Sequence, residues 1–271
     1  MIERCSGMKK RILIIIIALF MVISLISCVS STTPTITDAP SPTLSISPTA
    51  IETPTPTVTK APTPTITKAP TPTITIKPFE IIFTKSAIPD NIYKMMLGKT
   101  IHTDSIMKIE NLSYITLTFY GYDDKLHIGH IIMDKSLADE VIEIFRILLN
   151  AKFPIEKIIL PDAYGGNDEL SMRDNNTSGF NDRPIKNSGG ALSYHQLGRA
   201  IDINPLYNPY INLKTGDIQP STAGAYLDRT KDLKGMIKPN DVCVKAFKDK
   251  GWEWGGDWTT VKDYQHFEKA K

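Results

Sequence analysis

Residues 29–78 form a proline- and threonine-rich tract that cannot build a hydrophobic core. Within it, an eight-residue unit, Lys-Ala-Pro-Thr-Pro-Thr-Ile-Thr, begins at Lys60 and again at Lys68. Proline fixes φ and removes backbone donors, so such a tract favours extended polyproline II, a semi-rigid spacer with a rise of about 3.1 Å per residue. A disordered linker is the alternative. On either interpretation a core must come from residues 79–271, which are numerous enough for one well-buried domain.

The first 28 residues predict export from the cytoplasm. Residues 9–11 are basic, and residues 12–26 are almost wholly apolar. A basic segment followed by an apolar run too short to span a bilayer is typical of a secretory signal peptide. The run ends in Leu-Ile-Ser-Cys at Cys28, which resembles the bacterial lipobox and implies lipidation of Cys28. An ordinary signal peptide and an uncleaved anchor are the alternatives.

All three interpretations place the rest of the chain outside the cytoplasm. We therefore expect an extracytoplasmic lipoprotein of the cell membrane, with residues 1–28 as the signal peptide and lipobox. Residues 29–78 would then be a disordered stalk that lets residues 79–271 reach into the cell wall.

Charge and cysteine content exclude other classes of protein. The net charge is +2 and the basic and acidic residues are interspersed, so the sequence has no electrostatic footprint for nucleic acid. Cys5 and Cys28 lie in the targeting region, which leaves Cys243 alone in the folded part. No internal disulfide framework can form there. We interpret Cys243 as a small buried apolar residue.

Residues 79–271 predict an α+β fold, a single compact domain with a small antiparallel sheet flanked by helices. Two runs rich in β-branched and aromatic residues, 109–120 and 126–133, indicate a hairpin. Apolar residues recur at three- and four-residue spacing in residues 135–150, which predicts a helix capped by Asp134.

The remaining segments are less regular. Residues 154–160 predict a short strand, and residues 162–190 a long polar loop whose length indicates a functional role. A last helix is expected over residues 241–250, with Asn240 as its cap and Gly251 as its end. Three prolines are expected to prevent regular structure until about residue 223: Pro205, Pro209 and Pro220.

Candidate metal ligands lie in two stretches that are far apart in the sequence. His195 and Asp202 lie in the first stretch, and His266 lies in the second. Two imidazoles and a carboxylate are ligands that a hydrolytic Zn²⁺ uses, with a fourth position left to water. Gly198 permits a bend between His195 and Asp202, after which residues 200–203 can form a strand.

The densest aromatic segment of the chain contains three tryptophans, Trp252, Trp254 and Trp258. They form either a wall that binds sugar or peptide or a part of the hydrophobic core. Of the three, Trp252 has the more core-like surroundings in the sequence.

The two stretches together resemble the M15 zinc peptidases, which include D-Ala-D-Ala carboxypeptidases and dipeptidases and L-alanyl-D-glutamate endopeptidases. The resemblance extends over about residues 168–268. It depends on Ser193, His195, Gly198, Ala200 and Asp202, on Trp254-Gly255-Gly256-Asp257-Trp258, and on Asp263-Tyr264-Gln265-His266-Phe267-Glu268.

This resemblance implies an M15/Hedgehog-like fold with His195, Asp202 and His266 as zinc ligands. It also implies that Asp263 is the general base and that Arg183 holds the substrate or its transition state. Either Asp257 or Glu268 would orient a ligand histidine from outside the metal site.

We therefore predict a zinc metallopeptidase that hydrolyses peptide bonds in peptidoglycan stem peptides, as a D-Ala-D-Ala carboxypeptidase or an L-Ala-D-Glu endopeptidase. The alternative is a non-catalytic, zinc-containing module that binds the cell wall. Asp263 favours the enzyme, because a module that only binds needs no base.

Overall fold

The computed structural model describes residues 79–183 and 192–270. All of them belong to the second of the two units into which the chain divides, Pro72–Lys271. The predictions for residues 1–28 and 29–78, and for Cys28, lie outside the described residues. Within the described residues, no helix is both long enough and apolar enough to cross a membrane.

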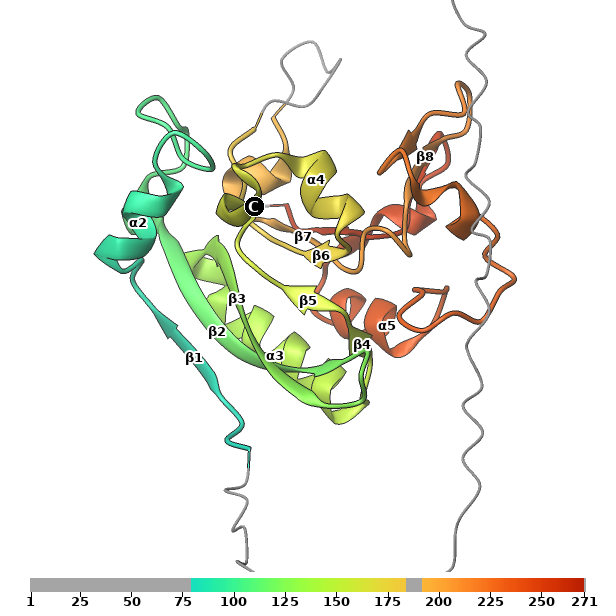
Figure 1. Cartoon of the computed structure of the whole chain (residues 1–271), viewed down its shortest axis with the longest axis horizontal. Coiled ribbons are helices and arrows are strands. Elements are labelled where there is room, and N and C mark those ends of the chain that lie inside the picture. The colour runs from blue at the N-terminus through green and yellow to red at the C-terminus, as the bar shows by residue number, and fades with distance from the viewer. Residues whose placement is uncertain (1–78, 184–191, 271) are drawn as a thin grey trace, which may run out of the picture. The chain divides into compact units, whose positions relative to one another are not determined.

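The largest sheet is built around the predicted hairpin. Strands β2 (Leu112–Gly121) and β3 (Leu126–Asp134) pair antiparallel along their whole length, which confirms the hairpin. Strand β1 (Phe83–Ser86) pairs antiparallel with β2, and the short strand β4 (Pro154–Ile155) pairs parallel with it. The sheet is strongly twisted (Figure 1). Ile115, Leu117 and Phe119 of β2 alternate along the strand and point into the main core. On the opposite face, Leu112 belongs to a second, smaller apolar cluster and Tyr114 packs against it.

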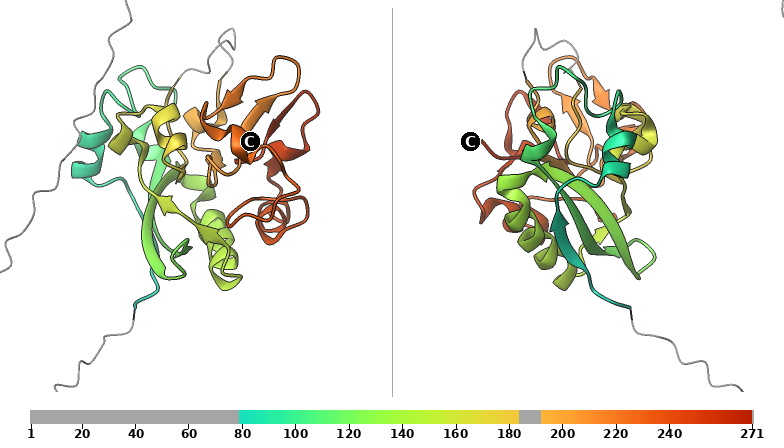
Figure 2. Two further views of the ribbon diagram at one scale, coloured as in Figure 1. Left: turned by 45° about the vertical axis from the view of Figure 1, so that its right-hand side comes forward. Right: turned by 90° about the vertical axis from the view of Figure 1, so that its left-hand side faces the viewer.

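Helix α3 (Ala138–Asn150) covers the buried face of this sheet, as the apolar spacing predicted. The Asp134 side chain accepts a hydrogen bond from the Ser136 amide, and the first turn, η3 (Lys135–Leu137), is a 3₁₀ helix. Five side chains of α3 are buried and join the main core: Ala138, Val141, Ile144, Phe145 and Leu148. A second helix, α5 (Val242–Lys248), packs against α3. Figure 2 shows the N-terminal sheet beside the C-terminal strands and helix.

The predicted strand at residues 154–160 is split into β4 and β5 (Lys157–Ile158), each of two residues. Helix α5 is capped by Asp241, whose side chain accepts the Val244 amide, and not by Asn240 as predicted. Asn240 instead adopts a left-handed φ of 65° just before the cap. Cys243 in α5 is fully buried, as predicted, and burial raises the pKa of its thiol.

The segment predicted as a long loop from residue 162 contains regular structure, so that prediction was wrong in its first half. Residues Pro161–Tyr164 form the 3₁₀ helix η4, and Asp168–Arg173 form the helix α4, capped by the Asn167 side chain. Strand β6 (Asn176–Thr177) then pairs parallel with β5. These elements are too short for hydrophobic periodicity to reveal them. Residues 184–191 lie outside the described residues.

Two small antiparallel sheets complete the fold and carry the C-terminal motifs. One contains β10 (Glu253–Trp254), β12 (His266–Glu268) and β7 (Ala200–Asp202), in that order. The other contains β11 (Val261–Asp263), β8 (Tyr210–Asn212) and β9 (Ile218–Gln219). The α+β class with small antiparallel sheets is therefore confirmed.

Strands β8 and β9 correct the prediction that prolines prevent regular structure up to residue 223. Pro209 immediately precedes β8 and Pro220 immediately follows β9. A proline next to a strand removes no hydrogen bond from within the ladder. The other short elements of the described chain are α2 (Asp90–Met96), η2 (Ile109–Asn111), η6 (Ala223–Tyr226) and η7 (Gly255–Asp257).

Candidate metal centre

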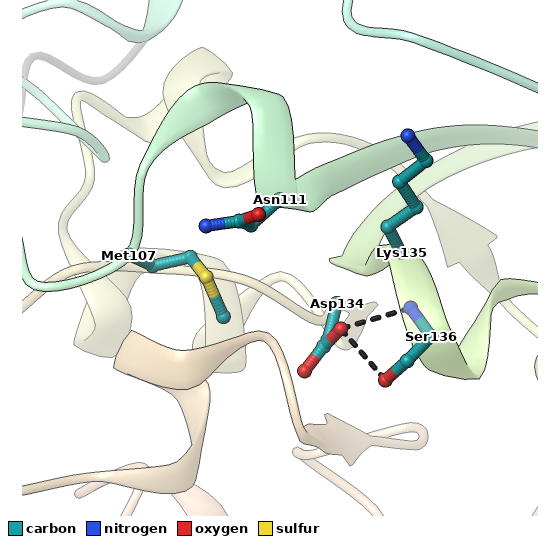
Figure 3. Close-up of a pocket in the computed structure, with 5 residues that line it drawn as sticks. All are labelled: Met107, Asn111, Asp134, Lys135 and Ser136. Carbon is teal, nitrogen blue, oxygen red and sulfur yellow. Dashed lines mark hydrogen bonds between the residues drawn. The ribbon is translucent and has the colours of Figure 1, made fainter.

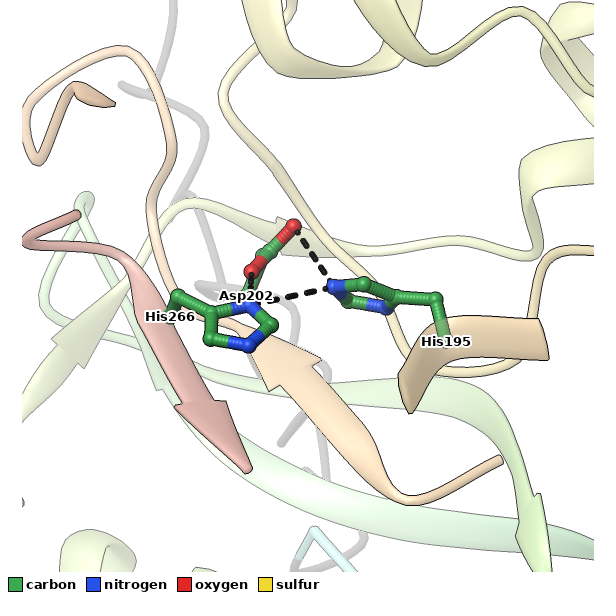
Figure 4. Close-up of side chains that lie close together, drawn as sticks. All are labelled: His195, Asp202 and His266. Atoms are coloured by element: carbon green, nitrogen blue, oxygen red, sulfur yellow. Dashed lines mark hydrogen bonds and ion pairs between the residues drawn. The ribbon is translucent and has the colours of Figure 1, made fainter. Parts of the chain in front are cut away.

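The structure brings together the three side chains that the sequence singled out as metal ligands. Nε2 of His195 lies 3.2 Å from Oδ2 of Asp202 and 3.3 Å from Nδ1 of His266. Nδ1 of His266 lies 3.0 Å from Oδ1 of Asp202. All three side chains are buried. Figure 4 shows the two rings and the carboxylate converging on one point.

A turn and a strand deliver His195 and Asp202 to this point. His195 lies in the 3₁₀ helix η5 (Tyr194–Leu197), which begins with a capping box between Ser193 and Gln196. Gly198 ends η5 with a left-handed φ of 62°, and β7 then carries Asp202. The predicted bend at Gly198 is confirmed, because only glycine enters this backbone region at no steric cost.

Strand pairing brings His266 beside Asp202 across 64 residues of sequence. In the antiparallel ladder between β7 and β12, His266 is the direct partner of Asp202. Directly opposed residues of a ladder project from the same face of the sheet. On its other side, the Asp202 backbone exchanges two hydrogen bonds with Ser178. Asp202 is therefore held from both sides.

The outward-facing nitrogen of each histidine has an acceptor. Nδ1 of His195 lies 2.7 Å from the carbonyl oxygen of Gly179, and Nε2 of His266 lies 2.8 Å from Oε2 of Glu268. A carbonyl or carboxylate oxygen can only accept, so each of these nitrogens donates its proton. The inward nitrogens, Nε2 of His195 and Nδ1 of His266, are then the atoms that could bind a metal ion, once any proton on Nδ1 of His266 has left.

We call His195, Asp202 and His266 the histidine cluster. Glu268, and not Asp257, is the acidic residue that orients one of its histidines, His266. The Asp257 side chain is exposed and forms an ion pair with Lys248.

Neighbouring side chains of the cluster shift the pKa values of Asp202 and His266. Burial alone would raise the pKa of Asp202, but His195 and His266 hold it well below its usual range. Burial disfavours a charged His266 ring, yet hydrogen bonds to Asp202 and Glu268 outweigh it and raise the pKa of His266 to about 10. A proton on His266 thus balances two acids, as a cation bound at the same place would.

The donor set fits a small transition-metal ion. A tetrahedral ion with bonds of about 2.1 Å holds its ligand atoms roughly 3.4 Å apart. Nε2 of His195 and Nδ1 of His266 are 3.3 Å apart, and each lies 3.0 to 3.2 Å from a different oxygen of Asp202. One ligand atom from each of the three residues lies within 4.8 Å of the other two. Two imidazole nitrogens and one carboxylate oxygen suit Zn²⁺, and the set leaves one position of a tetrahedron free. His195, Asp202 and His266 could therefore hold a metal ion.

Asp263 lies at the end of β11, opposite Tyr210 of β8 and three residues before His266. Its Oδ1 atom is buried and has no hydrogen-bond partner among the described residues. Burial, reinforced by the charge of Asp202, raises the pKa of Asp263 to about 7, although His266 acts in the opposite direction. A buried carboxyl that titrates near neutrality is suited to accept and return a proton.

Arg183 lies in the segment that leads toward η5, and it does not touch the three cluster residues. Its Nη2 atom lies 2.6 Å from Oδ2 of Asp168, the first residue of α4. Burial raises the pKa of the Asp168 carboxyl, although Arg183 acts in the opposite direction. The charges of Asp202 and His195 also act on this pKa, so Asp168 is within electrostatic reach of the cluster. Asp168 therefore lies between the two: it pairs with Arg183 and is affected by the charges of Asp202 and His195.

The tryptophans divide between the two roles left open by the sequence. Trp252 and Trp254 are buried in the main core. Trp258 is partly exposed, and its ring centroid lies 5.5 Å from that of His266. Only Trp258 is placed to form a wall beside the cluster.

A separate open pocket lies at the end of β3 and contains none of the candidate site residues (Figure 3). Its lining residues are Met107, Asn111, Asp134, Lys135 and Ser136. Asp134 in this pocket caps η3 and pairs with Arg199 at 2.9 Å, so its carboxylate already has structural partners. We assign the chemistry to the histidine cluster and not to this pocket.

Sequence reasoning missed two contributors to the site. The Gly179 carbonyl has no side-chain signal, so nothing in the sequence could identify it. Asp168 stands in an acidic first turn after Gly165, Gly166 and Asn167, a pattern typical of a helix start and not of a site.

Comparison with known families agrees with this geometry. Residues 186–269 match the model of an M15 peptidase family described as D-alanyl-D-alanine carboxypeptidase. The matched segment includes His195, Asp202, Asp263 and His266, and it begins three residues after Arg183. No solved structure matches the chain at a significant level.

Proposed function

We propose, from the match of residues 186–269 to the model of an M15 peptidase family, that this protein is a zinc metallopeptidase that cuts peptide bonds in peptidoglycan stem peptides. One observation carries the proposal: two histidines and an aspartate meet within hydrogen-bonding distance inside the matched segment. An acidic residue with a raised pKa, Asp263, stands beside them. The finer assignment of the fold, an M15/Hedgehog-like domain, belongs to the same proposal.

His195, Asp202 and His266 would hold the zinc ion. When bound, zinc polarises a substrate carbonyl and makes water a nucleophile near neutral pH. Glu268 and the Gly179 carbonyl keep the two rings in the tautomers that present Nε2 of His195 and Nδ1 of His266. The protein thereby fixes the donor atoms before any ligand arrives, which lowers the reorganisation needed for binding.

Asp263 would move the proton. In its ionised form, Oδ1 accepts a proton from the attacking water, and the same oxygen can return it to the departing amine. The missing hydrogen-bond partner of Oδ1 leaves this atom free for that exchange. Its position three residues before His266 places it on the strand that precedes the cluster strand.

Arg183 would bind the substrate. Its guanidinium group is a planar fork of donors that suits a carboxylate or a carbonyl oxygen on which negative charge develops. A stem peptide offers both kinds of oxygen, so the role of Arg183 is compatible with a carboxypeptidase and with an endopeptidase.

The proposed location follows from the N-terminal sequence. A signal peptide in residues 1–28, lipidation at Cys28 and an extended stalk over residues 29–78 would tether residues 79–271 to the outer face of the membrane. Stem peptides of the cell wall are then within reach. Fifty residues of polyproline II extend on the order of 100 Å or more.

The decisive experiment is the digestion of purified peptidoglycan with and without a chelator, followed by mass spectrometry of the new termini. Loss of a terminal D-alanine identifies a D,D-carboxypeptidase, and a new N-terminal D-glutamyl group identifies an endopeptidase. Both cleavages should stop with the chelator and return with zinc. If the zinc-loaded protein binds peptidoglycan and cuts no bond, the protein is a binding module and not an enzyme.

A further inference from the structure

Asp168 and Arg183 form a largely buried ion pair next to the histidine cluster. Nη2 of Arg183 lies 2.6 Å from Oδ2 of Asp168, and the two side chains are only 27% and 19% exposed. An ion pair with so little solvent around it is weakly screened, and removing one partner leaves a poorly solvated charge. The pair is therefore a strong restraint on the direction of the guanidinium.

The backbone around Asp168 is held in place by the same segment that carries Arg183. Gly165 and Gly166 both have left-handed φ angles and form the turn before α4. The Asn181 side chain donates to the Gly166 carbonyl at 3.2 Å. The segment before α4 and the segment that carries Arg183 are thus joined by a hydrogen bond, from Asn181 to Gly166, and by the ion pair between Arg183 and Asp168.

A second set of contacts fixes the arginine segment from its other side. The Asp182 side chain accepts from Gln196 of η5 at 2.8 Å and from Ser105. The Asp182 amide donates to the Thr100 carbonyl at 3.0 Å. The backbone just before Arg183 is therefore fixed relative to η5, which carries His195, and the side-chain direction is what remains to be set.

We propose that Asp168 is a positioning residue that sets the direction of the Arg183 guanidinium relative to the histidine cluster. Asp168 acts only through Arg183 and does not touch the substrate. The inference rests on the proposed peptidase function and adds one residue to it. It also implies that Arg183 meets the substrate with part of its charge already neutralised.

The test is a double-mutant cycle with Asp168→Asn and Arg183→Lys in the zinc-loaded full-length protein, assayed on a stem peptide. Asp168→Asn should lower kcat/KM about 10-fold or more while zinc content stays at the wild-type level. In the Arg183→Lys background, Asp168→Asn should lower kcat/KM by less than about 2-fold, because the guanidinium group that Asp168 orients is already absent. Asp168→Glu keeps the charge and should recover part of the loss.

Asp174→Asn is the matched control. Asp174 follows the same helix, and it pairs with Lys157 at 2.8 Å, but its side chain is 49% exposed. This variant should keep kcat/KM within about 2-fold of the wild type, since exposed pairs contribute little.

A readout without turnover is the side-chain NMR signal of Arg183 in the zinc-loaded protein. The Asp168→Asn variant should show faster rotation of the guanidinium group and faster exchange of its protons. The positioning role would be overturned if the Arg183 signals were unchanged in Asp168→Asn. It would also be overturned if the losses of kcat/KM in the two single variants added up in the double variant. A wild-type protein that cuts no stem peptide would instead refute the proposed function, and the NMR experiment would then decide the positioning role alone.

Discussion

Two acceptors outside the cluster, Glu268 and the Gly179 carbonyl, decide which nitrogen of each histidine faces Asp202. Each accepts a hydrogen bond from one ring, so the opposite nitrogen, Nε2 of His195 or Nδ1 of His266, faces the place where the three side chains meet. An acceptor of this kind also raises the basicity of the ligand nitrogen. These two hydrogen bonds therefore determine which nitrogen of each ring could bind a metal ion.

Glu268→Gln should weaken zinc binding about 10- to 100-fold, because a neutral amide is a poorer acceptor for Nε2 of His266. Competition with a fluorescent chelator measures the affinity. Glu253→Gln is the control, since Glu253 is exposed and is the direct partner of Glu268 in the β10–β12 ladder. Equal zinc affinity in the two variants would contradict the role of Glu268.

Asp263→Asn should keep zinc and lose at least about 100-fold in kcat, the usual contribution of a general base. Zinc content by elemental analysis and turnover of a stem peptide are measured on the same sample. Asp257→Asn changes an exposed acid that pairs with Lys248, so it should leave both quantities unchanged. Loss of zinc in Asp263→Asn would mean that Asp263 is a ligand and not the base.

His266 makes the metal-free protein pH-dependent in a defined direction. Its pKa is raised from 6.5 to about 10, so its protonation stabilises the metal-free fold fully below pH 6.5, and this stabilisation is lost as the pH rises to 10. The melting temperature of the metal-free protein should therefore fall over this range. His266→Gln should remove most of the slope.

The same proton must leave when a metal binds, because Nδ1 of His266 cannot hold both. At pH 8, zinc binding should release about one proton, measured by calorimetry in two buffers of different ionisation enthalpy. A binding enthalpy that is the same in both buffers would contradict this expectation.

At the scale of elements, Gly198 connects η5 to β7 in a place where no side chain fits. Its φ is 62°, and a β-carbon there would lie 2.6 Å from the Asp134 amide nitrogen. The Gly198 carbonyl accepts from the same amide at 2.8 Å, so the turn is bound to the end of β3. This contact links the element carrying His195 to the large sheet.

Gly198→Ala should destabilise the fold by clearly more than the about 1–2 kcal/mol that a left-handed backbone costs by itself, because the new methyl group must also displace backbone. Urea denaturation measures the difference. Gly216→Ala is the matched control: its φ is 78°, and nothing lies within 4 Å of the added carbon. If the two variants lose the same free energy of unfolding, the close approach of Gly198 to Asp134 is unimportant.

At the scale of the whole molecule, the described residues form one set of packed layers that includes the candidate site. The main core joins residues of the large sheet, α3, α5 and the C-terminal strands in a single cluster. Residues 1–78 are predicted to export and tether the protein, and they are not predicted to contribute to the core.

Deletion of residues 1–78 should therefore leave the melting temperature and the hydrolysis of soluble stem peptides unchanged, since no predicted core residue is removed. The same deletion, and Cys28→Ser, should move the protein from the membrane fraction to the soluble fraction of cells. Western blotting of the fractions measures this change. Membrane association that survives Cys28→Ser would favour an uncleaved anchor over a lipid.

Local patterns in the sequence predicted the hairpin, helix α3 and the bend at Gly198. Alternation, apolar spacing and glycine each act over a few residues, so they can be recognised without the rest of the chain. The same reasoning failed for α4, β8 and β9, since elements of two to six residues are too short to show a period.

By itself the sequence determined the chemical kinds of the candidate donor groups and predicted the three residues that the structure brings together, His195, Asp202 and His266. Only the tertiary structure decided that Glu268, and not Asp257, faces His266 and that Trp258 alone stands beside the cluster. It also decided that Asp168 holds Arg183. The physical reason is that donor chemistry belongs to single residues, whereas partners across a ladder or between helices depend on packing between distant segments of the chain.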